Sequence, residues 1–182
     1  STHPSIKFCR QCAGPMVTRV PEGDDHQRHM CDDCGYVEYL NPRCIVGCLP
    51  VWEGQVLLCL RNIEPRRGYW TLPAGFMENG ESVEEGSLRE CREEAGAEMD
   101  LDRLFAVYST PEVSQVYMIF LGHLKHTDFT PNFETQEARM FAPEDIPWDQ
   151  LAFRSVEFAL RKFVEHGTEK PTSVWTGASQ NI

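Results

Sequence analysis

The sequence of 182 residues contains no long hydrophobic run and has little positive charge. Its longest apolar stretches, 44–52 and 116–121, are far shorter than the roughly 20 residues that a membrane-spanning helix needs. Lysine and arginine number 17 against 28 acidic residues, and the formal net charge of -11 disfavours partners bound mainly through their phosphates. We therefore expect no membrane association and no nucleic-acid partner.

The N-terminal residues also lack the apolar core of a secretory signal peptide, so we expect a cytoplasmic protein. A composition of 41% hydrophobic and 25% charged residues is typical of a globular chain with a buried core. Eight cysteines are many for this length. In a reducing compartment they are expected to be metal ligands or buried thiols, and disulfides in a secreted module are the disfavoured alternative.

Four of the cysteines form two Cys-x-x-Cys pairs, separated by 18 residues: Cys9 with Cys12, and Cys31 with Cys34. Each pair can direct two thiolates at one ion, and two pairs complete the tetrahedral site that zinc prefers. Residues 1–40 are therefore predicted to form a zinc ribbon stabilised by structural Zn²⁺. The ribbon carries four basic and six acidic residues, which favours a structural role over nucleic-acid binding.

The remaining cysteines lack this spacing and are predicted to be small buried side chains: Cys44, Cys48, Cys59 and Cys91. None has a histidine close in sequence, which disfavours thiol catalysis.

The chain after the ribbon shows mixed strand and helix patterns, which predict an α/β or α+β sandwich over residues 41–167. Glu53-Gly54 is a candidate hairpin turn. Ser82 and Glu85 form a capping box before one helix, and Gly96 is expected to end it. Residues 168–182 are expected to form a loose tail. The predicted strands are 16–20, 36–39, 44–51, 55–61, 70–72, 105–108, 116–124 and 140–141, and the predicted helices are 82–95 and 155–165.

Glu90, Glu93 and Glu94 stand at positions i, i+3 and i+4 of the first predicted helix and so project from one side. Like charges at this spacing repel, and a divalent cation would compensate. Oxygen ligands of this kind select Mg²⁺ or Mn²⁺. The alternative for a run of glutamates is a solvated acidic face.

The loop before this helix, 72–75, decides between these interpretations. The segment resembles the Nudix box, G-x5-E-x7-R-E-U-x-E-E-x-G-U, in which U is apolar. Cys91 and Ala97 are only weakly apolar at the U positions, a minor departure. The positions that match are Gly75, Glu81, Arg89, Glu90, Cys91, Glu93, Glu94, Gly96 and Ala97.

Similarity to the Nudix family implies an α/β/α sandwich with a mixed sheet and hydrolysis of a nucleoside diphosphate linked to another moiety. It implies that Glu90, Glu93 and Glu94 bind catalytic Mg²⁺ or Mn²⁺, together with the Ala74 carbonyl. Gly75, Glu81 and Gly96 would maintain the box, and Arg89 would orient the glutamates through ion pairs. Glu134 or Glu137 would add a further carboxylate as ligand or base, with Glu134 favoured.

The combination of zinc ribbon and Nudix box resembles one subgroup of the family, which includes bacterial NADH pyrophosphatases. Their S-Q-P-W-P-F-P signature is replaced here by residues 109–117. The subgroup also includes the plant plastid enzymes that hydrolyse FAD and ADP-ribose. These are more similar over roughly residues 7–165, in the segments 41–50, 54–65, 68–82, 115–120 and 145–153. The expected substrate is therefore a small molecule of the dinucleotide type, either FAD, which would be split into FMN and AMP, or ADP-ribose.

Two activities remain as alternatives within the enzyme class, NADH hydrolysis and hydrolysis of capped RNA ends. A nucleotide-sensing module whose ribbon contacts a macromolecule is the alternative of another class. The family also implies a homodimer by analogy. Six residues are candidate substrate contacts, although a surface role for each arginine or a core role for each aromatic residue fits about as well. They are Arg61, Arg66, Arg67, Tyr69, Phe76 and Tyr117.

Overall fold

The computed structural model describes residues 5–169 and 173–179. The chain divides into two compact units, Ser1–Pro42 and Arg43–Ile182, and each is described by itself. None of the helices in the described residues is long and apolar enough to cross a membrane. The homodimer stays a prediction.

The first unit is a small antiparallel sheet of β1 (Met16–Arg19), β2 (Arg28–Cys31) and β3 (Val37–Glu38). The sequence pattern predicts β1 and β3 but not β2, because Arg28 and His29 interrupt the apolar pattern of that strand. Its buried apolar side chains are few, and Cys9 and Cys31 are among them. A unit with so little core needs another source of stability, such as a bound ion.

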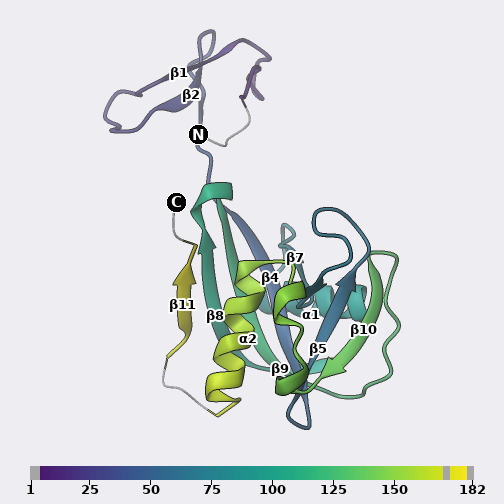
Figure 1. Ribbon diagram of the computed structural model, residues 1–182. Coiled ribbons are helices and arrows are strands. Elements are labelled where there is room, and N and C mark those ends of the chain that lie inside the picture. Colours follow the sequence, from purple (N-terminus) through teal and green to yellow (C-terminus); the bar gives the residue numbers. More distant parts are fainter. Residues whose placement is uncertain (1–4, 170–172, 180–182) are drawn as a thin grey trace. The chain divides into compact units, whose positions relative to one another are not determined.

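The second unit contains a mixed sheet in the order β10-β5-β4-β9-β8-β11, with β6 paired to β5 and β7 paired to β4 (Figure 1). The β4–β9 and β8–β11 pairs are parallel, and the other pairs are antiparallel. The strands are β4 (Arg43–Trp52), β5 (Gln55–Arg61), β6 (Trp70–Thr71), β7 (Ala74–Phe76), β8 (Met99–Thr110), β9 (Gln115–Leu124), β10 (Thr135–Phe141) and β11 (Trp175–Ala178).

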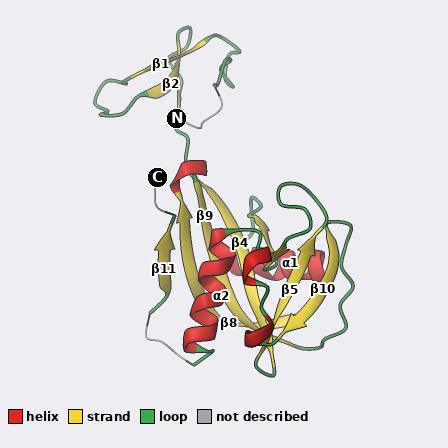
Figure 2. Ribbon diagram, in the orientation of Figure 1, coloured by secondary structure: helices red, strands yellow, loops and turns green. Residues whose placement is uncertain are grey.

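Helices α1 (Val83–Ala95) and α2 (Arg154–His166) lie on opposite faces of this sheet, which gives the expected α/β/α sandwich (Figure 2). Alternate strand residues face opposite layers. Leu49 of β4 packs in the core that includes the α2 residues Val156 and Leu160, whereas its neighbour Cys48 packs with Cys91 of α1. Three 3₁₀ turns complete the unit: η1 (Pro111–Val113), η2 (Pro143–Asp145) and η3 (Trp148–Gln150).

The local signals around α1 and the first hairpin are confirmed. Ser82 accepts a hydrogen bond from the Glu85 N–H, and the Glu85 carboxylate accepts one from the Ser82 N–H. Gly96 ends the helix with a positive φ of 62°. Glu53 and Gly54 both have positive φ and form the β4–β5 turn.

Two expectations were wrong. The segment after Gly167 is not a loose tail throughout, because β11 pairs in parallel with β8 from Trp175 to Ala178. The ring of Trp175 also stacks on His166, which ties this strand to the end of α2. Cys44 is exposed, although Cys48, Cys59 and Cys91 are buried as predicted. Cys44 lies near the start of β4, ahead of the buried part of that strand.

Candidate functional site

The box loop lies where the sheet opens between β4 and β5. These strands pair only beside their turn, at Val51 with Val56 and Trp52 with Gln55. Further along, β4 pairs with β7 and β5 pairs with β6, so the loop joining β6 to β7 enters the gap. Gly47 of β4 permits this approach, because a Cβ there would lie 2.6 Å from the Pro73 carbonyl oxygen.

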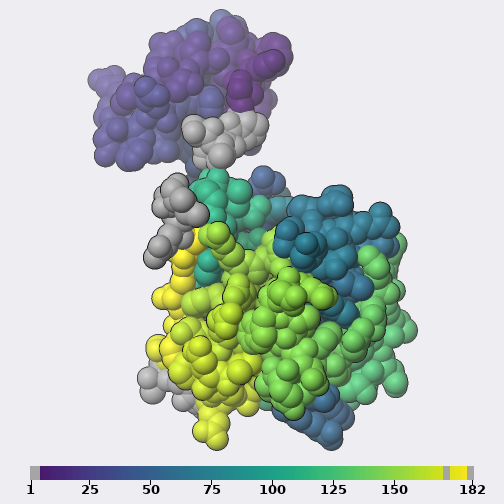
Figure 3. Space-filling view, viewed as in Figure 1, coloured from purple at the N-terminus to yellow at the C-terminus, as the bar shows by residue number. Residues whose placement is uncertain are grey.

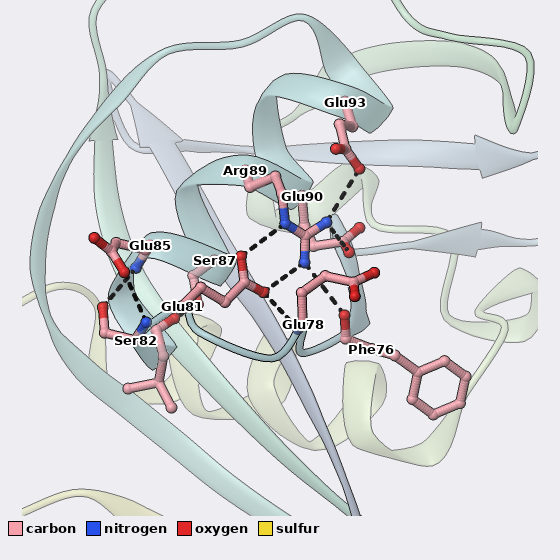
Figure 4. A network of polar contacts seen from close by, with 10 residues as sticks. Phe76, Glu78, Glu81, Ser82, Glu85, Ser87, Arg89, Glu90 and Glu93 are labelled. Atoms are coloured by element: carbon pink, nitrogen blue, oxygen red, sulfur yellow. Dashed lines mark hydrogen bonds and ion pairs between the residues drawn. The ribbon is translucent and has the colours of Figure 1, made fainter.

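Arg89 of α1 joins the box carboxylates into one network (Figure 4). Its Nε and Nη2 donate to both oxygens of Glu81 at 2.9 and 2.7 Å. Its Nη1 donates to Glu90 at 2.8 Å and to Glu93 at 3.1 Å, and Nη2 also reaches the Phe76 carbonyl at 3.2 Å. One guanidinium therefore links α1, the loop before it and β7.

Glu90 and Glu94 are buried, each with 7% of its surface exposed. Gly75 leaves room for Glu90, since a Cβ there would overlap its carboxylate. Burial raises the pKa of Glu94 to about 8, and the charge of Glu90 adds to the rise, whereas the Ala74 N–H at 3.1 Å opposes it. Burial also raises the pKa of Glu90, whereas Arg89 lowers the pKa of Glu81 to about 2.

These carboxylates have the chemistry of a site for a hard divalent cation. Two buried glutamates with raised pKa values need a positive charge to be stable as anions. Glu93 is more exposed and is held by Arg89 through a surface-facing ion pair. The box glutamates do not place three donor atoms within 4.8 Å of one another. Arg89 holds the carboxylates of Glu90 and Glu93, and the carboxylate of Glu94 accepts a hydrogen bond from the Ala74 N–H. The donor set fits such an ion, and Arg89 sets its present arrangement.

A pocket of about 560 Å³ lies beside these glutamates. Three of the six candidate substrate contacts line it, namely Arg61, Phe76 and Tyr117. Nε of Arg61 donates to the Pro65 carbonyl at 2.8 Å, and its guanidinium carbon lies 5.1 Å from the centre of the Phe153 ring, another part of the lining. Phe76 is 47% exposed, as expected for a side chain at the edge of an open site.

The other three candidates lie outside the pocket lining. Arg66 donates to the carbonyls of Ala152 and Leu151 and stacks on the ring of Tyr69 at 3.9 Å. Arg67 donates to the Asn62 side chain. The bonds of Arg66 anchor the loop after β5 to the segment before α2, and the two stretches adjoin in the space-filling view (Figure 3). The expectation that Arg66, Arg67 and Tyr69 contact substrate is not supported by their positions.

The structure also places the two candidates for a further carboxylate in different surroundings. Glu134 lines the pocket, and its negative charge helps to raise the pKa values of Glu90 and Glu94. Glu137 lies on β10 away from this lining, and both of its oxygens accept from Arg139, at 2.8 and 3.0 Å. The geometry therefore favours Glu134 and not Glu137 beside the glutamates of the box.

Several lining residues carry no sequence signal that would have identified them. Gln115 begins β9, Phe153 precedes α2, and Ser155 lies in the first turn of that helix. Gln115 and Ser155 are common polar residues at the ends of elements, and only the tertiary fold brings them to the same pocket as the box.

The four ribbon cysteines form a separate cluster, with all four sulfur atoms within 4.8 Å of one another. Cys9 Sγ lies 3.7 Å from Cys34 Sγ, and Cys12 Sγ lies 3.4 Å from Cys31 Sγ. A tetrahedral ion with Zn–S bonds of about 2.3 Å requires sulfur separations of about 3.8 Å. The N–H groups of Gln11 and Gly14 donate to Cys9 and Cys12, which would stabilise thiolates. The cluster therefore fits a zinc ion.

The fold, the box and the cysteine cluster define a Nudix hydrolase with an N-terminal zinc ribbon. The Nudix domain model matches residues 42–165, and the Nudix N-terminal zinc-ribbon model matches residues 7–40. The chain belongs to the Nudix family. The enzymes of this family act with divalent metals.

Similar proteins fall within the same family. An ADP-ribose pyrophosphatase from Methanocaldococcus jannaschii is 34% identical over 127 residues, covering 65% of this chain and 71% of the relative. The NAD-capped RNA hydrolase NudC from Vibrio vulnificus is 29% identical over 147 residues, covering 79% of this chain and 53% of NudC. The chain thus spans about half the length of this relative.

A solved structure covers nearly the whole chain. The crystal structure of a NUDIX hydrolase from Nitrosomonas europaea is 46% identical, with a TM-score of 0.90 over 96% of this chain and 99% of that one. The match therefore extends over both the ribbon and the Nudix domain.

Proposed function

We propose that this protein hydrolyses the diphosphate bond of ADP-ribose and of FAD, with Mg²⁺ or Mn²⁺ bound by Glu90, Glu93 and Glu94. The observation that carries the proposal is the convergence of these glutamates and Glu134 on one pocket. The relative named as an ADP-ribose pyrophosphatase supports the first substrate. FAD is proposed from the resemblance to the plant plastid enzymes.

The site can supply each part that diphosphate hydrolysis needs. Divalent cations offset the charge that develops on the phosphoryl oxygens and lower the pKa of bound water. Glu90, Glu93, Glu94 and the Ala74 carbonyl would hold them. Glu134 lines the same pocket and would accept the proton of the attacking water. Arg61 would contact a phosphoryl oxygen, since it lines the pocket and its positive charge acts on Glu94.

Arg89 would act as a positioning residue. Its bonds to Glu81, Glu90 and Glu93 fix the orientation of these carboxylates before a metal binds. Glu81 also accepts from the Glu78 N–H at 2.7 Å, so the same ion pair fixes the loop that leads into α1. The ribbon would hold one structural Zn²⁺ at Cys9, Cys12, Cys31 and Cys34.

A second candidate is hydrolysis of an NAD-containing substrate, either NADH or an NAD-capped RNA end. The relative named NudC favours this candidate, since the match to it covers 79% of the present chain. An RNA substrate would need a cationic path for the strand, and the net charge of -11 disfavours one.

A substrate panel tests the proposal. Purified protein is incubated with ADP-ribose, FAD, NADH, NAD-capped RNA and nucleoside triphosphates, with Mg²⁺ or Mn²⁺, and the release of AMP, FMN, NMN or phosphate is followed. We expect turnover of ADP-ribose and FAD to exceed that of the others. Preferred turnover of NADH or capped RNA would select the second candidate. Binding without turnover of any substrate would contradict the enzyme and favour a nucleotide-sensing module.

A further inference from the structure

Part of the pocket lining is apolar, unlike the charged glutamates. Its sheet wall is formed by Ile45 of β4 and Ile119 of β9, and the start of α2 closes it with Phe153 and Val156. These side chains are apolar or aromatic and suit a planar ring, and the Arg61 guanidinium lies 5.1 Å from the centre of the Phe153 ring.

Three neutral polar side chains lie in this apolar surrounding: Gln115 and Tyr117 on β9 and Ser155 on α2. The Tyr117 hydroxyl donates to Oε1 of Gln115 at 3.2 Å, which fixes the orientation of the amide. In the described part of the chain no protein group accepts from the Gln115 amide nitrogen, which leaves its two hydrogens for a ligand in the pocket.

Ser155 is the most buried member of this group. It is 2% exposed, and its hydroxyl oxygen has no hydrogen-bond partner of good geometry among the described residues. The serine hydroxyl acts against the burial that raises the pKa of Tyr117, so the two hydroxyls lie close together. Buried hydroxyls are normally hydrogen-bonded, and one left unpaired beside a ligand pocket calls for a functional explanation. The helix start adds no side-chain cap, because its N-cap residue is Phe153.

We propose that Gln115, Tyr117 and Ser155 form a specificity subsite for a planar heteroaromatic ring of the dinucleotide substrate. The Gln115 amide donates to an acceptor atom on the edge of the ring, and the apolar walls cover its faces. Tyr117 is a positioning residue that orients the amide, and the Ser155 hydroxyl, which has no partner of good geometry among the described residues, offers a second polar contact to the ring. The inference rests on the proposed function, because it takes the diphosphate to lie against the box glutamates.

The ring has two sources in these substrates, the adenine or the ring of the other half. Equilibrium binding of the monophosphates AMP, FMN and NMN distinguishes them, with ribose 5-phosphate as the ligand that lacks a ring. Calorimetry on the full chain with Mg²⁺ measures binding without turnover. A failure of the proposed hydrolysis is therefore distinguishable from a failure of the subsite.

For Gln115→Ala we expect affinity for at least one ring monophosphate to fall about 5- to 10-fold, the value of one hydrogen bond, with ribose 5-phosphate unaffected. A loss confined to AMP assigns the subsite to adenine, and a loss confined to FMN or NMN assigns it to the other ring. Gln150→Ala, an exposed glutamine in η3, is the control and should leave every affinity unchanged.

Ser155→Ala separates a contact with the ligand from a structural role. Removing an unpaired buried hydroxyl should leave the melting temperature unchanged or raised, because no hydrogen bond of good geometry is lost. We expect it to weaken ring binding all the same, and Ser155→Thr to restore part of the affinity. The subsite is overturned if Gln115→Ala leaves all four ligands unchanged, or if it weakens ribose 5-phosphate as much as the ring compounds.

Discussion

Arg89 offers the most informative perturbation, because one side chain neutralises several carboxylates. In Arg89→Met the aliphatic stem is retained, while the bonds to Glu81, Glu90 and Glu93 are lost. The side chains of Arg89 and Glu90 are 21% and 9% exposed, so this network is more protected from solvent than a surface pair. The variant leaves adjacent carboxylates without their cation.

The expected cost follows from that burial. Removing one partner of a fully buried ion pair costs about 3–5 kcal/mol. Because Arg89 and Glu93 are partly exposed, we expect about 2–4 kcal/mol of lost stability for Arg89→Met in the absence of divalent cations. A loss of this size in a unit of this length should lower the melting temperature by roughly 5–15 °C. Saturating Mg²⁺ should recover part of it, since a bound cation would replace the missing charge.

Tryptophan fluorescence is a suitable assay, because all four tryptophans (Trp52, Trp70, Trp148 and Trp175) lie in the Arg43–Ile182 unit and report its unfolding. Arg92→Met, an exposed arginine on the same helix, is the matched control and should cost less than about 1 kcal/mol. The reasoning fails if Arg89→Met is as stable as Arg92→Met, or if Mg²⁺ stabilises the variant no more than the parent protein.

Three further predictions follow from the site and the ribbon. Burial raises the pKa of Glu94 to about 8, so the folded protein keeps a proton on this carboxyl that the unfolded chain loses near pH 4.5. Without added divalent cations, the melting temperature should therefore fall as pH rises from about 5 to 8. Glu94→Gln should flatten this dependence, and an equally steep curve in the variant would contradict the assignment. Glu134→Gln should lower turnover by at least about tenfold and Glu137→Gln by less than twofold, as measured by AMP release; the reverse order would make Glu137 the further carboxylate. One zinc per chain is expected by elemental analysis, and Cys9→Ser should abolish it while the tryptophan-reported transition is retained; loss of that transition would show that the Nudix unit depends on the ribbon.

Features set by neighbouring residues were predictable from the sequence. The strand 55–61 has the bounds of β5, and the Glu53-Gly54 turn and the Ser82–Glu85 capping box are present as expected. Turns and caps depend on residues only a few positions apart, so their signal is local. The cysteine spacing is of the same kind, because each Cys-x-x-Cys pair forms within one turn.

Features set by distant contacts were not predictable. Nothing local indicates that Trp175–Ala178 pairs with β8, or that β4 and β5 separate to admit the box loop. The arginines near the pocket show the same difficulty. Arg61 and Arg66 lie five positions apart, yet Arg61 lines the pocket whereas Arg66 binds the carbonyls before α2. Their roles depend on the segment that each faces after folding.

The dependence of turnover on divalent cations tests the central claim most directly. The initial rate of ADP-ribose hydrolysis is measured against Mg²⁺ concentration in metal-depleted buffer for the parent protein, Glu93→Gln and Glu84→Gln. Glu84 is an exposed glutamate on the same helix and serves as the matched control. We predict no turnover without the cation, saturation as Mg²⁺ is added, and a loss of at least about 100-fold for Glu93→Gln only. Turnover independent of divalent cations, or equal rates for the two variants, would contradict the account.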